Sequence, residues 1–274
     1  MTNQTARAPV SQPPALLREQ VGGIAILTLN RPESRNSLSE GLIAAVTAAL
    51  KEIHDDAKVR AVVIAATGKV FSAGHDMKEL TARRSDPDRG RAYFAGIMTQ
   101  CSTMMQAIVH LPKPVVAAVQ GIATAAGCQL VATCDLAVAS ETASFATPGV
   151  DIGLFCSTPM VALSRNVPRK HTMEMLLTGE PVSATTARDI GLVNHVVPAG
   201  TERDAAIALA QKVARKSAYT IRIGKAAFYR QAEMSLADAY AYAAEVMTEN
   251  MMARDAEEGI GAFIEKREPR WQDK

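Results

Sequence analysis

The sequence has few cysteines and no long apolar run. Its four cysteines form no CxxC pair, which argues against a disulfide scaffold and against the usual spacings of zinc sites. We predict reduced thiols in a reducing compartment and no metal site. The first twenty residues are polar, contain proline, and hold no run long enough for a signal peptide or a membrane span. We expect no membrane association and a disordered leader over residues 1–19.

An excess of charge of one sign is also missing. The chain of 274 residues carries 30 basic and 28 acidic residues, and the basic ones are scattered, so the composition gives no reason to expect a nucleic-acid partner. There is no GxGxxG after a strand, no GxxxxGK[ST] loop and no GxSxG turn. These absences argue against a dinucleotide-binding fold, a P-loop and a serine-hydrolase elbow.

Apolar runs and helical periodicity alternate along residues 20–198. IAILTLN (Ile24–Asn30) and VRAVVIAATG (Val59–Gly68) read as strands, the second buried between two layers. Apolar residues at helical spacing predict a helix over Ser37–Asp56, and further helices are expected over Arg91–Leu111 and Pro159–Leu177. This alternation predicts an α/β domain with mostly parallel strands.

After residue 198 the strand signals stop. Three or four alanine-rich helical stretches fill Thr201–Lys266. A helical region with apolar faces and no sheet to cover suggests packing on the main body or on a neighbouring subunit. We therefore separate residues 199–274 from the core as a C-terminal helical region.

The stretch VFSAGHDMKEL (Val70–Leu80) ends a strand and starts a helix. Asp76 fits the N-cap position, and Glu79 three residues later completes a pattern like a capping box. The N–H groups just before such a helix have no internal partner. Taken alone, the stretch favours simple capping of a surface helix over a binding role.

The stretch GIATAAGCQLVATCDLA (Gly121–Ala137) places small residues before a buried helix over Gly127–Cys134. Small residues let another group approach the backbone, and the helix start presents unpaired donors with partial positive charge. The alternative is that the small residues only permit tight packing of the chain.

Together these two stretches resemble the enoyl-CoA hydratase/isomerase family, the crotonases. The resemblance extends over nearly the whole chain, through LNRPESRNSL, MEMLLTGEPVSATTARDIGLVNHVVP and GIGAFIEKREPRW. SFATPGVDIGLFCSTP is most similar to the branch called enoyl-CoA hydratase domain-containing proteins. The resemblance implies a spiral of ββα units, a C-terminal helical trimerisation region, and homotrimers that often pair into hexamers.

The family also implies a bound acyl-CoA thioester, with coenzyme A as part of the substrate and no separate cofactor. By motif position, the N–H groups of His75 and Ala126 hold the thioester oxygen in a backbone oxyanion hole. Such preorganised donors are worth about 3 kcal/mol each to a developing oxyanion. The residues expected around the substrate are Ala73, His75, Asp76, Met77, Lys78, Ala126 and, from the C-terminal end, Lys266.

The sequence departs from the family where hydration needs two carboxylates. Gln129 stands where hydratases have the glutamate of GGGCE, and Gly149 stands where they have the glutamate of FGxPE. An amide does not exchange a proton at neutral pH, and glycine has no side chain. Because such groups typically supply about 10²–10⁴-fold each, we expect hydration to be inefficient. Ala126, where glycine is usual, adds a β-carbon beside the thioester.

Other residues could replace the missing acids. Asp151 lies two residues beyond Gly149, on the same face if the segment is extended, and Ser157 lies where some branches place an aspartate. His75 has the best intrinsic pKa for proton transfer. Cys128 and Cys156 adjoin the site but fit the pattern of inert buried thiols.

Three functions stay open at this point. The chain is an enoyl-CoA hydratase of fatty-acid metabolism, another thioester enzyme (isomerase, hydrolase or decarboxylase), or a non-catalytic acyl-CoA-binding regulatory protein. The family implies a cytoplasmic location in bacteria and the mitochondrial matrix in eukaryotes.

Overall fold

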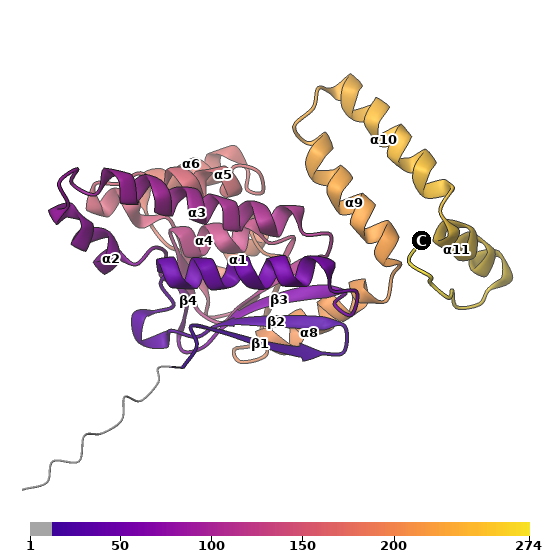
Figure 1. Cartoon of the computed structure of the whole chain (residues 1–274), viewed down its shortest axis with the longest axis horizontal. Coiled ribbons are helices and arrows are strands. Elements are labelled where there is room, and N and C mark those ends of the chain that lie inside the picture. The colour runs from indigo at the N-terminus through magenta and orange to yellow at the C-terminus, as the bar shows by residue number, and fades with distance from the viewer. Residues whose placement is uncertain (1–12) are drawn as a thin grey trace, which may run out of the picture.

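The computed structural model describes residues 13–274, and its largest element is a six-stranded sheet with the order β1-β2-β3-β5-β7-β10 (Figure 1). Only the first pair is antiparallel; the other neighbours run parallel. The strands are β1 Leu16–Val21, β2 Ile24–Leu29, β3 Ala61–Ala66, β5 Val115–Val119, β7 Leu136–Ser140 and β10 His195–Val197.

A smaller sheet has the order β4-β6-β8-β9, formed by β4 Val70–Ser72, β6 Ile122–Thr124, β8 Ser144–Ala146 and β9 Val182–Ser183. Strands β4, β6 and β8 pair in parallel, as β3, β5 and β7 do in the large sheet. The pairs β3–β4, β5–β6 and β7–β8 therefore each give one strand to each sheet before a helical segment follows. The predicted spiral of ββα units is confirmed.

The helices of the core are α1 Glu40–Asp55, α2 Met77–Ala82, α3 Arg91–His110, α4 Ala126–Thr133, α5 Ser157–Leu163, α6 Arg169–Thr178, α7 Ala184–Asp189 and α8 Glu202–Ala214, with 3₁₀ turns η1 Pro32–Ser34, η2 Arg83–Ser85 and η3 Pro148–Ile152. Helices α1, α3 and α4 match their predictions. Two helices replace the single helix expected over 159–177, because α5 ends at Leu163 and Pro168 occupies the N-cap of α6.

Both faces of the large sheet are buried, as the continuous apolar runs predict. On one face Leu27 and Ile64 belong to the main core together with residues of α1 and α3. On the other face Ile26 and Val63 pack with Ala206 and Ala210 of α8. The expectation that the C-terminal helices have no sheet to cover is therefore wrong for α8, which closes the second face of the core.

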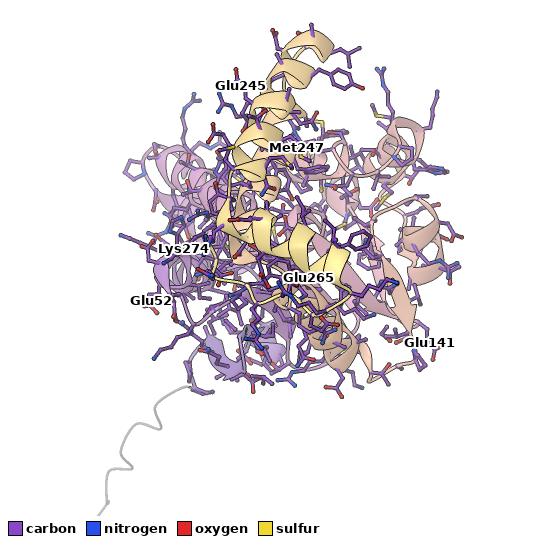
Figure 2. The ribbon with its side chains drawn as sticks, turned by 90° about the vertical axis from the view of Figure 1, so that its right-hand side faces the viewer. Glu52, Glu141, Glu245, Met247, Glu265 and Lys274 are labelled. Atoms are coloured by element: carbon purple, nitrogen blue, oxygen red, sulfur yellow. The ribbon has the colours of Figure 1, made fainter. Side chains whose placement is uncertain are left out.

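The last three helices, α9 Ala218–Gln231, α10 Leu236–Met251 and α11 Arg254–Glu265, leave the core as a projecting arm (Figure 1). No residue of α9 or α10 is buried; Glu245 and Met247, labelled in Figure 2, are both exposed on α10. We call α9–α11 the arm and residues 266–274 the tail. One anchor is a partly buried ion pair between Lys225 Nζ of α9 and Asp135 Oδ2, 2.6 Å apart, and Tyr229 donates to the same carboxylate.

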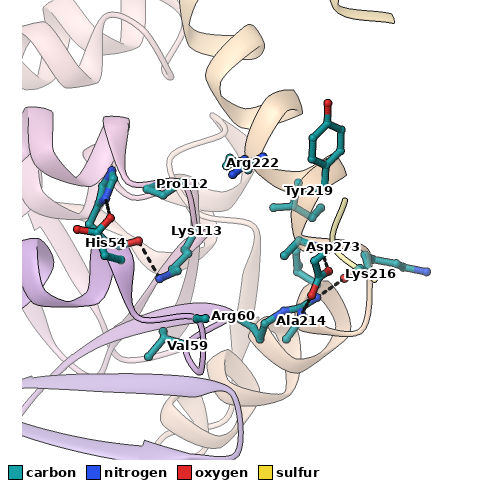
Figure 3. Close-up of a pocket in the computed structure, with 15 residues that line it drawn as sticks. His54, Val59, Arg60, Pro112, Lys113, Ala214, Lys216, Tyr219, Arg222 and Asp273 are labelled. Carbon is teal, nitrogen blue, oxygen red and sulfur yellow. Dashed lines mark hydrogen bonds and ion pairs between the residues drawn. The ribbon is translucent and has the colours of Figure 1, made fainter. Parts of the chain in front are cut away.

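A cavity of about 210 Å³ lies where the arm leaves the core (Figure 3). On its floor Arg60 pairs with Asp273 of the tail at 2.5 Å, while Asp273 also accepts the N–H of Ala218 at 2.7 Å. Across the cavity, Lys113 Nζ donates to main-chain carbonyls at the end of α1. The tail therefore ties the arm back to the start of β3.

The core begins before residue 20. Residues 1–12 of the expected leader lie outside the described residues, but Leu16 to Glu19 form part of β1, so the leader boundary at residue 19 is too late. Within residues 13–274, none of the helices has the length and apolar character to cross a membrane.

Candidate functional site

The loop that follows β4 is held along its length by residues 35–38, which follow η1. Ala73 N–H donates to Arg35 O at 3.0 Å, and Leu38 N–H donates to Gly74 O at 2.7 Å. Ser72 Oγ donates to Asn36 O at 2.8 Å and also accepts Gly74 N–H at 3.3 Å. The backbone before α2 is therefore fixed by its neighbour rather than free to adjust.

His75 sits at the end of this held loop. Its N–H donates to no acceptor among residues 13–274. Both ring nitrogens are buried and have no hydrogen-bond partner within the same residues. Burial lowers the pKa of His75 below its ordinary value of 6.5, and the nearby Leu38 carbonyl opposes this only in part. The imidazole is consequently neutral at pH 7.

Helix α4 starts at the second recognised stretch. Ala125, just before it, has φ 50° and ψ −120°, an unfavourable backbone conformation for a residue with a β-carbon. Ala126 is the first residue of the helix, and its N–H donates to no acceptor within the described part of the chain. Gly127 lies so close to β4 that an added Cβ would meet Ser72 O at 2.3 Å. Packing against β4 therefore requires glycine at 127, which is the second of the two explanations left open for the small residues.

The two segments touch. A Cβ built on Gly74 would lie 3.1 Å from Ala126 N and 2.9 Å from Ala125 Cβ. The structure thus brings the loop of His75 against the start of α4, although about fifty residues separate them in the sequence. Their two unpaired N–H groups belong to one small region.

Gln129 lies one turn into α4, three residues after Ala126. It is only 4% exposed, and its Oε1 is buried without a hydrogen-bond partner among residues 13–274. An unpaired buried acceptor is unfavourable by about 1–3 kcal/mol, so this oxygen needs a donor that the described chain does not supply. A water molecule or a ligand group can supply it.

Gly149 is buried in η3 and has no room for a side chain. An added Cβ would lie 2.7 Å from Leu154 O and 2.9 Å from Cys156 Sγ. The Leu154 N–H donates to Gly149 O at 2.9 Å, so the carbonyl in the way belongs to a closed turn. The backbone of this turn therefore excludes any side chain at position 149, and not only a carboxylate.

The other candidates for proton transfer are placed less favourably. Asp151 is exposed in η3, so the extended geometry that put it on the face of Gly149 is wrong. Ser157 is exposed at the start of α5. Cys128 and Cys156 are free, buried thiols; burial raises the pKa of Cys156 and raises that of Cys128 to about 12. No group of His, Cys, Asp and Glu within residues 13–274 is arranged to hold a metal ion.

The residues expected to contact coenzyme A are divided between two distant places. Met77 and Lys78 lie exposed at the start of α2, a few residues after Ala73 in the sequence. Lys266 is exposed at the C-terminal cap of α11. Figure 1 places α2 and α11 toward opposite ends of the molecule. Within one chain, Lys266 is therefore not part of the region around His75 and Ala126.

Asp76 caps α2 as predicted, but its capping box does not form. Its Oδ1 accepts Lys78 N–H at 3.0 Å, and its Oδ2 accepts Ser37 Oγ–H at 3.0 Å. Glu79 turns instead to the start of α1, where it accepts Glu40 N–H at 3.0 Å. The Glu79 carboxylate, expected to cap its own helix α2, thus caps the start of α1 instead.

Sequence reasoning missed Asn36 and Ser72, which hold the loop of His75. Asn36 is fully buried with φ 49°, and its side chain bonds three backbone groups: Arg31 N–H, Thr67 O and Val70 O. The available signal was an asparagine, a residue that tolerates a left-handed backbone, just after the turn-forming RPES.

Comparison with known proteins identifies the family of the chain. The model of the enoyl-CoA hydratase/isomerase family matches residues 19–274. The chain is 46% identical over 258 residues to enoyl-CoA hydratase domain-containing protein 3, mitochondrial, of Xenopus laevis, covering 94% of this chain and 86% of that protein. It is 45% identical to the Homo sapiens protein of the same name, with 95% and 84% covered.

Solved structures agree. A crystal structure of enoyl-CoA hydratase from Mycobacterium smegmatis superposes with a TM-score of 0.90 at 51% identity, covering 94% of this chain and 99% of that one. The human enoyl-CoA hydratase domain-containing protein 3 gives a TM-score of 0.89 at 45% identity, with 94% and 100% covered. The predicted resemblance to the domain-containing branch is confirmed, and the chain belongs to the enoyl-CoA hydratase/isomerase family, with the crotonase fold.

Proposed function

We propose that the protein binds an acyl-CoA thioester whose carbonyl oxygen accepts hydrogen bonds from the N–H groups of His75 and Ala126. The observation that carries this proposal is the pair of unpaired N–H groups on two segments that touch at Gly74. The first comes from a loop held by residues 35–38, and the second from the start of a buried helix. Both donors are fixed before the ligand arrives.

Such an arrangement favours reactions that place negative charge on the thioester oxygen. An enolate or a tetrahedral intermediate gains more from two fixed donors than the neutral thioester does. On this basis, removal of one donor weakens transition-state stabilisation by about 3 kcal/mol. The oxyanion hole therefore supports several thioester reactions and does not single out hydration.

Efficient hydration is the reaction that the site supports least. Gln129 can position a water molecule through its unpaired Oε1 but does not exchange protons at neutral pH. Gly149 contributes no side chain, and Leu154 O stands where one would begin. The site holds the oxygen but lacks the two carboxylates that would add water across the double bond.

A second candidate function has His75 as a base. Its neutral ring, with buried unpaired nitrogens, could take a proton from the carbon next to the thioester. In that step the C–H bond breaks, its electron pair forms the enolate, and the proton goes to a ring nitrogen. This is the first half of an isomerisation. If the ring turns away from the acyl chain, the protein is an acyl-CoA-binding regulatory protein.

We also propose a homotrimer or a dimer of trimers. The arm exposes large apolar side chains, and the core exposes another group around η3, α5 and α6. Two different apolar surfaces on one chain favour a head-to-tail interface that closes into a ring. In such a ring the Lys266 of one copy could approach the coenzyme bound near the Lys78 of another.

The named vertebrate relatives are mitochondrial proteins. By analogy we propose the mitochondrial matrix if this chain is eukaryotic and the cytoplasm if it is bacterial. The localisation is testable with a fluorescent fusion of the full chain.

The decisive experiment incubates the protein with saturated acyl-CoA, 2-enoyl-CoA and 3-enoyl-CoA esters, and reads masses and the conjugated absorbance. We expect saturable binding and little hydration of any 2-enoyl-CoA. Rapid hydration by the native chain would refute the missing-acid argument. Isomerisation of 3-enoyl-CoA that is lost in His75→Gln would favour the second candidate.

A gain-of-function variant sharpens the result. Gln129→Glu restores one carboxylate without a steric conflict, whereas Gly149→Glu would collide with Leu154 O and is unsuitable. Gln120→Glu is the matched control, because Gln120 Oε1 is also buried without a partner in the described chain. Hydration that rises in Gln129→Glu alone would indicate that the thioester is seated correctly.

A further inference from the structure

We infer that Asn36 is a positioning residue for the proposed oxyanion hole: it fixes the loop that carries the His75 N–H group. The inference rests on the proposed function, because it assigns a role to that N–H group. It concerns a residue on a different segment from either donor. Its support is a set of hydrogen bonds that converge on the loop after β4.

The first support is the pattern of bonds between residues 35–38 and 72–76. Ser72, Ala73 and Gly74 each bond to this segment through a hydroxyl, an N–H and a carbonyl. Asp76 bonds to it through the Ser37 hydroxyl. His75 lies inside this series, and its N–H has no acceptor among the described residues. We call residues 35–38 the clamp. The clamp orients the His75 N–H group without accepting a hydrogen bond from it.

The second support is the conformation of the clamp. Arg35 and Asn36 have φ of 55° and 49°, two consecutive non-glycine residues in the left-handed region. Such a conformation persists only where surrounding contacts hold it. The Asn36 side chain supplies those contacts with one accepted and two donated hydrogen bonds, each 2.8 Å long.

The third support is chemical. Asparagine offers an acceptor and two donors on one planar group, and all three reach main-chain groups here. Aspartate has the same shape but cannot donate to Thr67 O or Val70 O. Glycine keeps the left-handed backbone but removes every side-chain bond. Asn36→Asp therefore tests the two donated hydrogen bonds at constant side-chain shape. Asn36→Gly tests all the side-chain hydrogen bonds while the left-handed backbone is kept.

The test compares binding of butyryl-CoA with binding of its thioether analogue, which lacks the carbonyl oxygen. The ratio of the two dissociation constants isolates the contribution of the oxyanion hole from general loosening of the protein. We expect native protein to prefer the thioester, and Asn36→Asp to reduce that preference about tenfold. The carbonyl stretch of ¹³C-labelled butyryl-CoA should return toward its frequency in water.

Asn166→Asp is the matched control, because Asn166 Nδ2 also donates to two main-chain carbonyls, of Ala132 and Ala162, away from the clamp. It should leave the preference and the carbonyl frequency unchanged. An unchanged preference in Asn36→Asp would overturn the positioning role while leaving the oxyanion hole intact. Equal binding of thioester and thioether by native protein would instead refute the proposed function.

Folding of the variants is followed by circular dichroism and thermal unfolding. If Asn36→Asp does not fold, Asn36→Gly carries the test, since glycine suits the left-handed backbone. If neither folds at low temperature with saturating butyryl-CoA, Asn36 is required for the fold itself and the positioning role is rejected.

Discussion

The core and the arm use apolar residues in opposite ways. In the core, strands such as β3 and β5 bury their side chains on both faces, between the main cluster and α8. In the arm, no residue of α9 or α10 is buried. The large apolar side chains that the arm exposes are Phe228, Leu236, Tyr240, Met247, Met251, Met252, Ile260, Phe263 and Ile264.

The difference separates what the chain stabilises alone from what it leaves for an interface. The strands of the core bury their own apolar side chains, so the stability of the sheets comes from contacts within the chain. The arm carries an apolar surface that the chain does not cover, and such surfaces mark interaction sites. Four experiments can break or sharpen this contrast.

Matched phenylalanine truncations in the two regions should have the largest contrast. Phe145 is fully buried in β8, and Phe145→Ala should lower the free energy of unfolding by about 3–5 kcal/mol. Phe263 of α11 is 84% exposed, and Phe263→Ala should change the unfolding of an isolated chain by at most about 0.5 kcal/mol. Urea denaturation measures both, and sedimentation velocity should show a smaller assembly only for Phe263→Ala.

An assembly unaffected by Phe263→Ala would remove the arm's apolar face from the interface. A large loss of unfolding free energy in that variant, at concentrations where native protein is monomeric, would contradict the exposed position instead.

The partly buried ion pair at the root of the arm should give the next largest effect. Lys225 and Asp135 have side chains 8% and 16% exposed, and Lys225→Met leaves the Asp135 charge without its cation. We expect a loss of about 3 kcal/mol in the free energy of unfolding, because an uncompensated buried charge is strongly unfavourable. Lys212→Met, on the exposed side of α8, is the control.

Adding Asp135→Asn to Lys225→Met should recover part of the loss, because it removes the stranded charge. If Lys225→Met unfolds at the same urea concentration as the native protein, α9 is not anchored at this pair.

Loosening the tail should have a smaller and more local effect. Asp255 is 2% exposed and accepts Gln272 N–H at 2.7 Å and Asp273 N–H at 2.9 Å. Asp255→Asn removes the charge and weakens these bonds, so we expect a loss of about 1–2 kcal/mol. Trp271, the only tryptophan, donates to Arg215 O and packs on Gly259, so its fluorescence reports the tail.

In Asp255→Asn the unfolding midpoint reported by Trp271 fluorescence should shift to a lower urea concentration. The midpoint reported by far-ultraviolet circular dichroism, which follows mainly the core, should change little. The exposed Asp204→Asn is the control. Transitions that move together would mean that arm and core unfold as one unit.

Much of the core was predictable because its signals are local and repeated. The apolar runs of β3 and β5 give buried strands, and the helical stripe of α1 gives the face that packs on them. Asp76 as an N-cap was also predictable, since the capping bond is made within three residues. The His75 and Ala126 positions came from family motifs rather than from periodicity.

The remainder depends on contacts that sequence spacing does not specify. Glu79 fits a capping box in its own helix but bonds to Glu40 of another. Alanines at 206 and 210 predict a helix that packs closely, yet not which surface it covers. Gly149 looked like a lost glutamate, and only the position of Leu154 O reveals that the turn excludes a side chain there.

Mild acid should lower the stability of the core more than that of the arm, and this is the smallest of the expected effects. The folded pKa of His75 lies below 6.5 because of burial, so as pH falls through 6.5 the unfolded chain binds a proton that the folded chain does not. The free energy of unfolding therefore falls until the pH reaches the folded pKa. Charge-assisted hydrogen bonds from Arg267 of the tail lower the pKa of Glu258 in the arm to about 2, so the stability that this pair contributes is lost only below pH 4.5.

Between pH 6.5 and 5, the urea midpoint of the core should consequently decrease while the environment of Trp271 in the folded protein stays constant. His75→Phe, which cannot titrate, should flatten the part of this decrease that His75 causes, and the exposed His171→Phe should not. An identical pH dependence in native protein and His75→Phe would show that the ring of His75 is hydrated. It would then lack the buried, neutral state that proton transfer from a thioester requires.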